Sequence, residues 1–199
     1  IDLSVGAVMA ICGATAVSLT LSDTSLPAVL AVTLAVGLAC GIWNGFLVAV
    51  LRIQPIVATL ILMVAGRGIA QLITEGAILT FNDPGLAFLG SGAVFGIPVP
   101  ILLLAFLALA VGLTVRRTAL GLLLESVGIN RTASTLAGVR TRFLLIAVYA
   151  LSGLTAAMAG IIVAADIRGA DANNAGLWLE LDAILAVVIG GNSLSATRV

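Results

Sequence analysis

Long apolar runs alternate with short polar stretches along most of this chain. The five longest runs come close to the roughly 20 residues that a helix needs to cross the hydrocarbon core of a bilayer. They lie at 3–21, 27–50, 56–74, 97–115 and 143–165. Runs of this length that are rich in Leu, Val, Ala and Ile favour helices over the strands of a barrel. The pattern therefore predicts an all-α, polytopic transmembrane helical bundle.

Two further stretches interrupt this alternation. The apolar run at 177–191 has Glu180 and Asp182 near its start and is too short to span a bilayer, so we interpret it as a half-helix or a re-entrant segment. The stretch at 75–96 is rich in turn residues and contains neither Arg nor Lys. Its composition suits an external loop with a short surface helix.

Charge and composition narrow the function classes. Hydrophobic residues make up 61% of the chain and charged residues 9%, whereas a soluble domain has about 25% charged residues. All nine cations are Arg, His is absent, and Cys12 and Cys40 both lie inside apolar runs. The chain has no Lys for a P-loop, and it has neither His nor clustered Cys for a metal site or a nucleophile pair. We therefore expect no catalytic residue, metal or cofactor here.

The net charge of zero indicates no nucleic-acid partner, and the lipid bilayer is the expected surroundings.

The segment at 116–142 is the one long stretch that is both basic and polar. It carries five of the nine basic residues against a single acid, Glu125. The five are Arg116, Arg117, Arg131, Arg140 and Arg142. Loops enriched in Arg and Lys lie on the cytoplasmic side of a membrane protein. We therefore predict that 116–142 is a cytoplasmic loop and that 75–96 lies on the opposite side.

A short helix is predicted inside this loop. Asn130 can accept hydrogen bonds from the free N–H groups of a first turn, and Gly138 can adopt the left-handed conformation that ends a helix. Only about two turns fit between them, and a helix that short is marginal in water without packing partners. It is either part of an ordinary solvated loop or a docking element for another protein.

The residues of this loop resemble a known family. The loop contains a basic pair, a Gly, the run Glu125-Ser-Val-Gly-Ile-Asn130 and the run Leu136-Ala-Gly-Val139. These motifs are similar to the cytoplasmic coupling loop of ribose-type sugar permeases of ABC transporters. The resemblance extends along the chain. Its other matching motifs are Ile1–Gly6, Trp43–Gly45, Arg52–Pro55, Ala58–Leu60, Leu181–Ile184 and Val188–Gly191. The runs Ile61–Gly68 and Ala165–Trp178 most resemble the galactofuranose branch.

This resemblance implies a multi-pass permease of the bacterial inner membrane with roughly ten helices, each near the length that a bilayer requires. Residues 1–199 would form a single transmembrane domain that is truncated at both ends. The implied partners are an ATP-binding cassette subunit, a second permease subunit and a periplasmic sugar-binding protein. ATP would be bound by the partner ATPase, which would dock on the coupling loop. The residues expected to serve coupling are Gly128, Asn130, Ala133, Leu136, Ala137 and Gly138.

Polar residues inside the apolar runs are the candidates for a substrate path. A sugar needs hydrogen bonds to its hydroxyls more than it needs ion pairs. The candidates are Ser4, Asn44, Thr59, Arg67 and Gln71. For each neutral one, a hydrogen bond between packed helices is the more frequent role of such a residue, and Arg67 could equally snorkel to an interface. The stripe formed by Gly37, Gly41 and Gly45 likewise fits close helix packing or a pore-lining backbone.

The leading hypothesis is therefore a permease subunit of an ATP-driven importer for a monosaccharide, with galactofuranose as the expected sugar. An ion-coupled secondary transporter or a channel is the alternative. That alternative would call for several ionisable residues deep within the spans, but most of the acids lie near span ends. A third hypothesis, an intramembrane enzyme, is disfavoured because this chain has no His, no Cys pair and no cluster of metal ligands for the chemistry.

Overall fold

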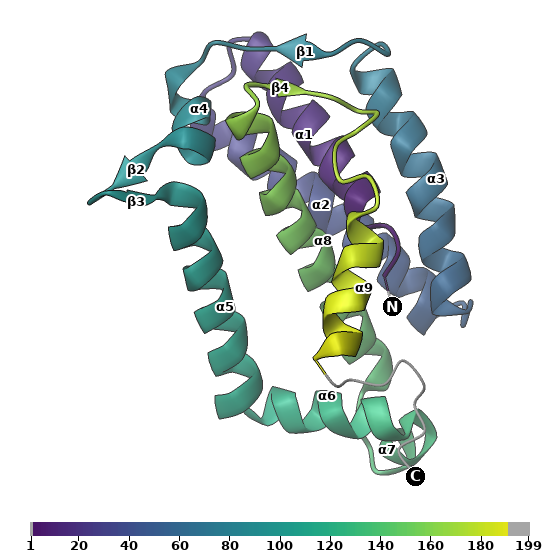
Figure 1. Ribbon diagram of the computed structural model, residues 1–199. Coiled ribbons are helices and arrows are strands. Elements are labelled where there is room, and N and C mark those ends of the chain that lie inside the picture. Colours follow the sequence, from purple (N-terminus) through teal and green to yellow (C-terminus); the bar gives the residue numbers. More distant parts are fainter. Residues whose placement is uncertain (1, 191–199) are drawn as a thin grey trace.

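The computed structural model describes residues 2–190 and shows a bundle of helices with very little sheet (Figure 1). The predicted all-α helical bundle is thereby confirmed. The helices are α1 Val5–Leu21, α2 Leu26–Ala49, α3 Pro55–Ile73, α4 Pro84–Ser91, α5 Val99–Arg117, α6 Ala119–Ile129, α7 Arg131–Leu136, α8 Thr141–Asp166 and α9 Leu179–Ile189. Among these residues, α2, α3, α5 and α8 are long and apolar enough to cross a membrane. The predicted runs match α1, α2, α3, α5 and α8 to within a few residues.

Helix α1 is the centre of the bundle. It packs against α2, α3 and α8, and its residues from Gly6 to Ala14 are all buried. A helix that is apolar on every side has no face suited to water and must be covered by other helices or by lipid. Small side chains on α1 and α8 permit this close approach: Gly13 of α1 faces the backbone of Gly160 of α8.

The closest helix pair is α2 with α8, and the glycine stripe of α2 forms their seam. A Cβ atom on Gly41 would lie 2.9 Å from the Cα of Ala150, and one on Gly45 would lie 2.8 Å from the Cα of Ile146. Gly153 of α8 faces the backbone of Gly37 and Gly41 in return. Helices approach this closely only when small residues line the contact. The close-packing interpretation of the stripe is therefore confirmed.

The segment at 116–142 is more ordered than the sequence analysis predicted. It is not one polar loop, because the apolar helix α6 fills 119–129 and turns sharply away from the end of α5 (Figure 1). Thr118 separates the two helices with an extended backbone, and its hydroxyl accepts a hydrogen bond from the N–H of Leu120. We missed α6 because the arginines on both sides dominate the charge pattern.

Short strands tie loops together at the opposite end of the bundle. Strand β1 (Leu79–Thr80) pairs antiparallel with β4 (Gly169–Ala170), and β2 (Ala93–Val94) pairs antiparallel with β3 (Ile97–Pro98). The predicted short helix in this loop is α4, whose first turn is capped by Asp83 through the N–H of Leu86 at 2.7 Å. It lies at the surface of the bundle, as expected, with Leu86 buried on the side that packs on α8 and Phe88 48% exposed on the other.

The short apolar segment near the end of the described chain forms α9. This helix has 11 residues, in agreement with the predicted half-helix, and it ends at Ile189 with Gly190 as its C-cap. Ile1 and Gly191, which belong to two of the resembling motifs, lie outside the described residues.

Candidate functional site

The predicted short helix at 130–138 is confirmed as α7. The side chain of Asn130 accepts a hydrogen bond from the N–H of Ala133 at 2.9 Å, which caps the first turn. Gly138 has φ +87°, the left-handed conformation expected after a last turn. The helix itself spans Arg131–Leu136, which is slightly shorter than the predicted range.

The side chains of α7 divide into three faces. Ser134 is buried, and its hydroxyl bonds back to the carbonyl of Asn130. Ala133, Leu136 and Ala137, which we expected to contact a partner, are exposed, and the Leu136 side chain is 85% exposed. An apolar side chain that is exposed to this extent, with small residues beside it, leaves room for the close approach of another protein surface.

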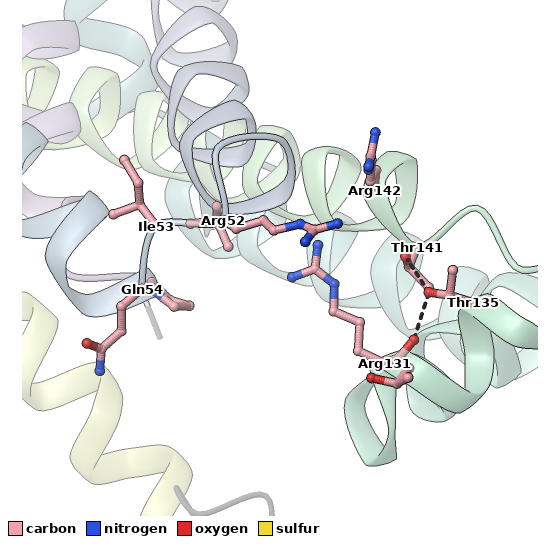
Figure 2. A pocket seen from close by; sticks show the side chains of 10 residues that line it. Arg52, Ile53, Gln54, Arg131, Thr135, Thr141 and Arg142 are labelled. Carbon is pink, nitrogen blue, oxygen red and sulfur yellow. Dashed lines mark hydrogen bonds between the residues drawn. The ribbon is translucent and has the colours of Figure 1, made fainter.

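The third face of α7 borders a cavity of about 470 Å³ between the α2–α3 turn, α7 and the start of α8 (Figure 2). Its lining consists of Val48, Arg52, Ile53, Gln54, Pro55, Arg131, Thr132, Thr135, Thr141 and Arg142. None of these residues is acidic. The hydroxyl of Thr135 bonds to the carbonyl of Arg131 at 2.8 Å and lies 3.1 Å from the hydroxyl of Thr141, which fixes α7 against α8.

Three of the five residues predicted to line a substrate path are buried inside the bundle. Ser4 and Asn44 bond to each other, with the Nδ2 of Asn44 donating to the Oγ of Ser4 at 2.8 Å. Asp2 extends this network by accepting from Ser4 and from Ser152 of α8, both at 2.7 Å. The hydroxyl of Thr59 bonds to the carbonyl of Pro55 within its own helix. In this structure, Ser4 and Asn44 join the N-terminal segment to α2.

Arg67 and Gln71 lie together on one face of α3, as their spacing predicted, and both hold the loop before α9. Arg67 donates to the carbonyls of Ala172 and Ala175 at 3.1 and 2.6 Å. Gln71 donates to the Oδ1 of Asn173 at 2.7 Å. The structure thus gives Arg67 protein partners, which offset the cost of placing its charge in an apolar helix.

The loop that these two residues hold has its own internal turn. Asp171 accepts from the side chain of Asn174 at 2.7 Å and from the backbone N–H groups of Asn173 and Asn174. These donors, with the nearby positive charge of Arg67, lower the pKa of Asp171 below 3.8, and the side chain of Asn174 contributes most.

A second cavity, of about 550 Å³, lies between α3 and α9. Its lining is mostly apolar, and its polar members are Arg67, Gln71 and Glu180, with Trp178 beside them. Glu180 is 6% exposed, and its Oε1 accepts from the N–H of Gly6. We did not single out Glu180 as a site residue. An acid at the start of an otherwise apolar run was the available signal. Within residues 2–190, no three His, Cys, Asp or Glu side chains gather as a metal site would require.

Comparison with protein families gives a match along the whole chain. The family described as "Branched-chain amino acid transport system / permease component" matches residues 1–199. The galactofuranose transporter permease protein YtfT of Escherichia coli K12 is 62% identical over 198 residues, which are 100% of this chain and 58% of that protein.

Two further relatives are more distant. The fructose import permease protein FruF of Bifidobacterium longum is 43% identical over 98% of this chain and 56% of its own length. The ribose import permease protein RbsC of Escherichia coli K12 is 37% identical over 100% of this chain and 63% of its own length. The chain therefore spans about three fifths of these relatives. No solved structure shows a significant match.

Proposed function

Because the chain belongs to the branched-chain amino acid transport system / permease component family, we propose that it forms part of the translocation path of an ATP-driven sugar importer. The chain is a multi-pass membrane protein, with helices α2, α3, α5 and α8 long and apolar enough to cross a bilayer. The proposed location is the bacterial inner membrane. The observation that carries the proposal is the 62% identity, along the entire chain, with a permease named for galactofuranose transport.

The proposed substrate is galactofuranose. The identity falls from 62% with the galactofuranose permease to 43% with the fructose permease and 37% with the ribose permease. This order supports galactofuranose as the substrate over fructose and ribose. Sugar hydroxyls are bound by a few well-placed polar groups in an otherwise apolar site. The cavity between α3 and α9 has this character, with Arg67, Gln71 and Glu180 as its polar members. Ser4, Asn44 and Thr59 then support the path indirectly by fixing the helices around it.

In this proposal, ATP hydrolysis in a partner ATP-binding cassette subunit supplies the energy for transport, so this chain needs no cofactor of its own. The open face of α7, formed by Ala133, Leu136 and Ala137, supplies the docking surface. Gly128 precedes it without close neighbours, and Asn130 and Gly138 fix the two ends of the helix. A second permease subunit would complete the path, and a periplasmic binding protein would deliver the sugar.

The test is transport with the matching system reconstituted in cells. Cells that carry the permease with its ATPase and binding protein should accumulate labelled galactofuranose in preference to ribose and fructose, and the ATPase should co-purify with the permease. Uptake that prefers ribose would remove the substrate assignment. A permease that purifies alone and transports with an ion gradient but without ATP would replace the importer by an ion-coupled carrier.

A further inference from the structure

Positive charge gathers in the cavity beside α7, and no acid among the described residues forms an ion pair with it. Arg52, Arg131 and Arg142 line it together with the polar side chains of Thr132 and Gln54, and none of the described lining residues is acidic. Like charges that share a cavity repel one another, and an anion bound between them removes that cost. Guanidinium groups also match the oxygens of phosphate better than other cations do.

Two of these arginines converge. Figure 2 shows the guanidinium groups of Arg52 and Arg131 extending toward one another, whereas the side chain of Arg142, which also lines the cavity, points away from them. Among the described residues, the Arg131 side chain makes one hydrogen bond, a long one of 3.4 Å to the carbonyl of Ala49, so most of its donors remain available. Arg52 has φ +57°, a strained conformation for a residue other than glycine. Glycine would adopt this conformation without strain, so the position of the Arg52 side chain at the cavity carries a conformational cost.

The cavity lies at the ends of helices that are long and apolar enough to cross a membrane, a position that suits a membrane interface. The cavity lies where the spanning helices α2, α3 and α8 meet the basic segment. Apolar side chains next to it are exposed, namely Val50, Leu51, Ile56 and Val57. Leu51, which directly precedes Arg52, is 54% exposed. The cytoplasmic leaflet carries anionic lipids that attract Arg near the surface, and basic pockets between helices on that side suit anionic headgroups.

The faces of α7 separate this cavity from the proposed ATPase surface. Arg131, Thr132 and Thr135 line the cavity, whereas Ala133 and Leu136 are exposed and do not line it. On a helix of 3.6 residues per turn, Arg131 and Thr135 point away from Ala133, whereas Thr132 lies one turn before Leu136 and borders both sides. An ATPase docked on the open side therefore leaves the cavity to another ligand.

We propose that the cavity binds the phosphodiester headgroup of an anionic phospholipid of the cytoplasmic leaflet, such as phosphatidylglycerol. Arg52 and Arg131 hold the phosphate, with Arg142 adding charge at the same cavity. The acyl chains lie along the exposed apolar side chains of Leu51 and Val57. The bound lipid joins the α2–α3 turn to α7 and so stabilises the position of the coupling helix. This site does not depend on which sugar is carried.

The test is lipid binding to the purified permease in detergent, measured by native mass spectrometry and by thermal shift. Phosphatidylglycerol should bind and raise the melting temperature more than phosphatidylcholine with the same acyl chains. The double variant Arg52→Gln with Arg131→Gln should bind phosphatidylglycerol roughly 10-fold to 100-fold more weakly, because charge-assisted hydrogen bonds are lost. Arg117→Gln removes a cation of the same segment outside this cavity and should leave binding unchanged.

Further measurements distinguish a bound phospholipid from other ligands of the cavity. Arg52→Lys with Arg131→Lys keeps the charge and should restore part of the binding, which excludes misfolding as the cause of the loss. Inorganic phosphate and glycerol phosphate should produce no comparable thermal shift. If phosphate alone reproduces the shift, or if the double variant binds phosphatidylglycerol normally and loses the ATPase instead, the lipid site is wrong. Equal binding of both lipids by the unaltered protein would also overturn it.

Discussion

The Oε1 of Glu180 accepts a hydrogen bond of 2.9 Å from the N–H of Gly6, across 174 positions of sequence. Gly6 lies in the first turn of α1, where Ser4 provides no side-chain cap and the helix dipole leaves partial positive charge. A side chain on Gly6 would meet Glu180 and the carbonyl of Gly176. Glu180 thus connects α9, most of whose side chains are exposed, to the central helix.

This connection predicts a specific loss of stability. Glu180→Ala should destabilise the protein by roughly 1–3 kcal/mol, because the buried N–H of Gly6 loses its acceptor. Glu180→Gln should cost less, since its amide oxygen can still accept. The matched control is Asp182→Asn, which changes an exposed acid of the same helix and should have little effect. Thermal unfolding in detergent measures all three. Equal melting temperatures for Glu180→Ala and Asp182→Asn would mean that the bond contributes nothing.

The glycine seam between α2 and α8 gives a second prediction. Gly41→Ala places a methyl group against the backbone of Tyr149 and Ala150 and should destabilise the pair by about 1–3 kcal/mol. Gly112→Ala on α5 is the control, because a Cβ there meets no atom within 4 Å. That change should be neutral or slightly stabilising, since alanine favours helix more than glycine does. A Gly41→Ala protein as stable as Gly112→Ala would contradict the close contact.

The sequence predicted the spans well because membrane helices follow from run length and hydropathy, which are local properties. The cap at Asn130 and the left-handed Gly138 were also predictable, since both depend on residues within one or two turns. Helix α6 was missed for the opposite reason. Its apolar residues at 119–129 are too few for a span, and the arginines around them outweighed them in the pattern.

The partners of the polar residues could not be predicted from sequence. Arg67 and Gln71 share a face of α3 by helical spacing, but their bonds to Ala172, Ala175 and Asn173 join positions about a hundred residues apart. The pairing of Glu180 with Gly6 depends likewise on how α9 sits against α1. Such contacts arise only when the bundle has assembled, and no periodic pattern encodes them.

Membrane orientation gives a third prediction. Phe95 is 100% exposed in the β2–β3 turn and Leu136 is 85% exposed on α7, at opposite ends of the bundle (Figure 1). With Cys12 and Cys40 replaced, Phe95→Cys should react with an impermeant maleimide in intact cells, and Leu136→Cys should react only after lysis. Leu136 is a better probe than its neighbour Ser134, which is buried. The opposite labelling pattern would invert the predicted topology.

The final prediction concerns the contact between α7 and the ATPase. Ala137→Glu should leave folding intact, because Ala137 is exposed in this chain. A bulky charge at a close contact costs about 1–3 kcal/mol, so the affinity for the ATPase should fall by roughly one to two decades. Leu136→Ala, which removes an exposed apolar side chain, should weaken association in the same direction. A pull-down of the ATPase, with sugar uptake measured in parallel, gives the result.

The control for this experiment is Ala77→Glu, which adds the same charge to an exposed position of the opposite loop. It should reduce neither association nor uptake. Because Arg131 and Thr135 line a different face of α7 from Ala137, the lipid binding proposed above should also survive Ala137→Glu. Loss of lipid binding together with ATPase association would mean that the change displaced the whole helix. Undiminished association and transport would mean that α7 only connects α6 to α8, and energy coupling would then have to act through another part of the permease.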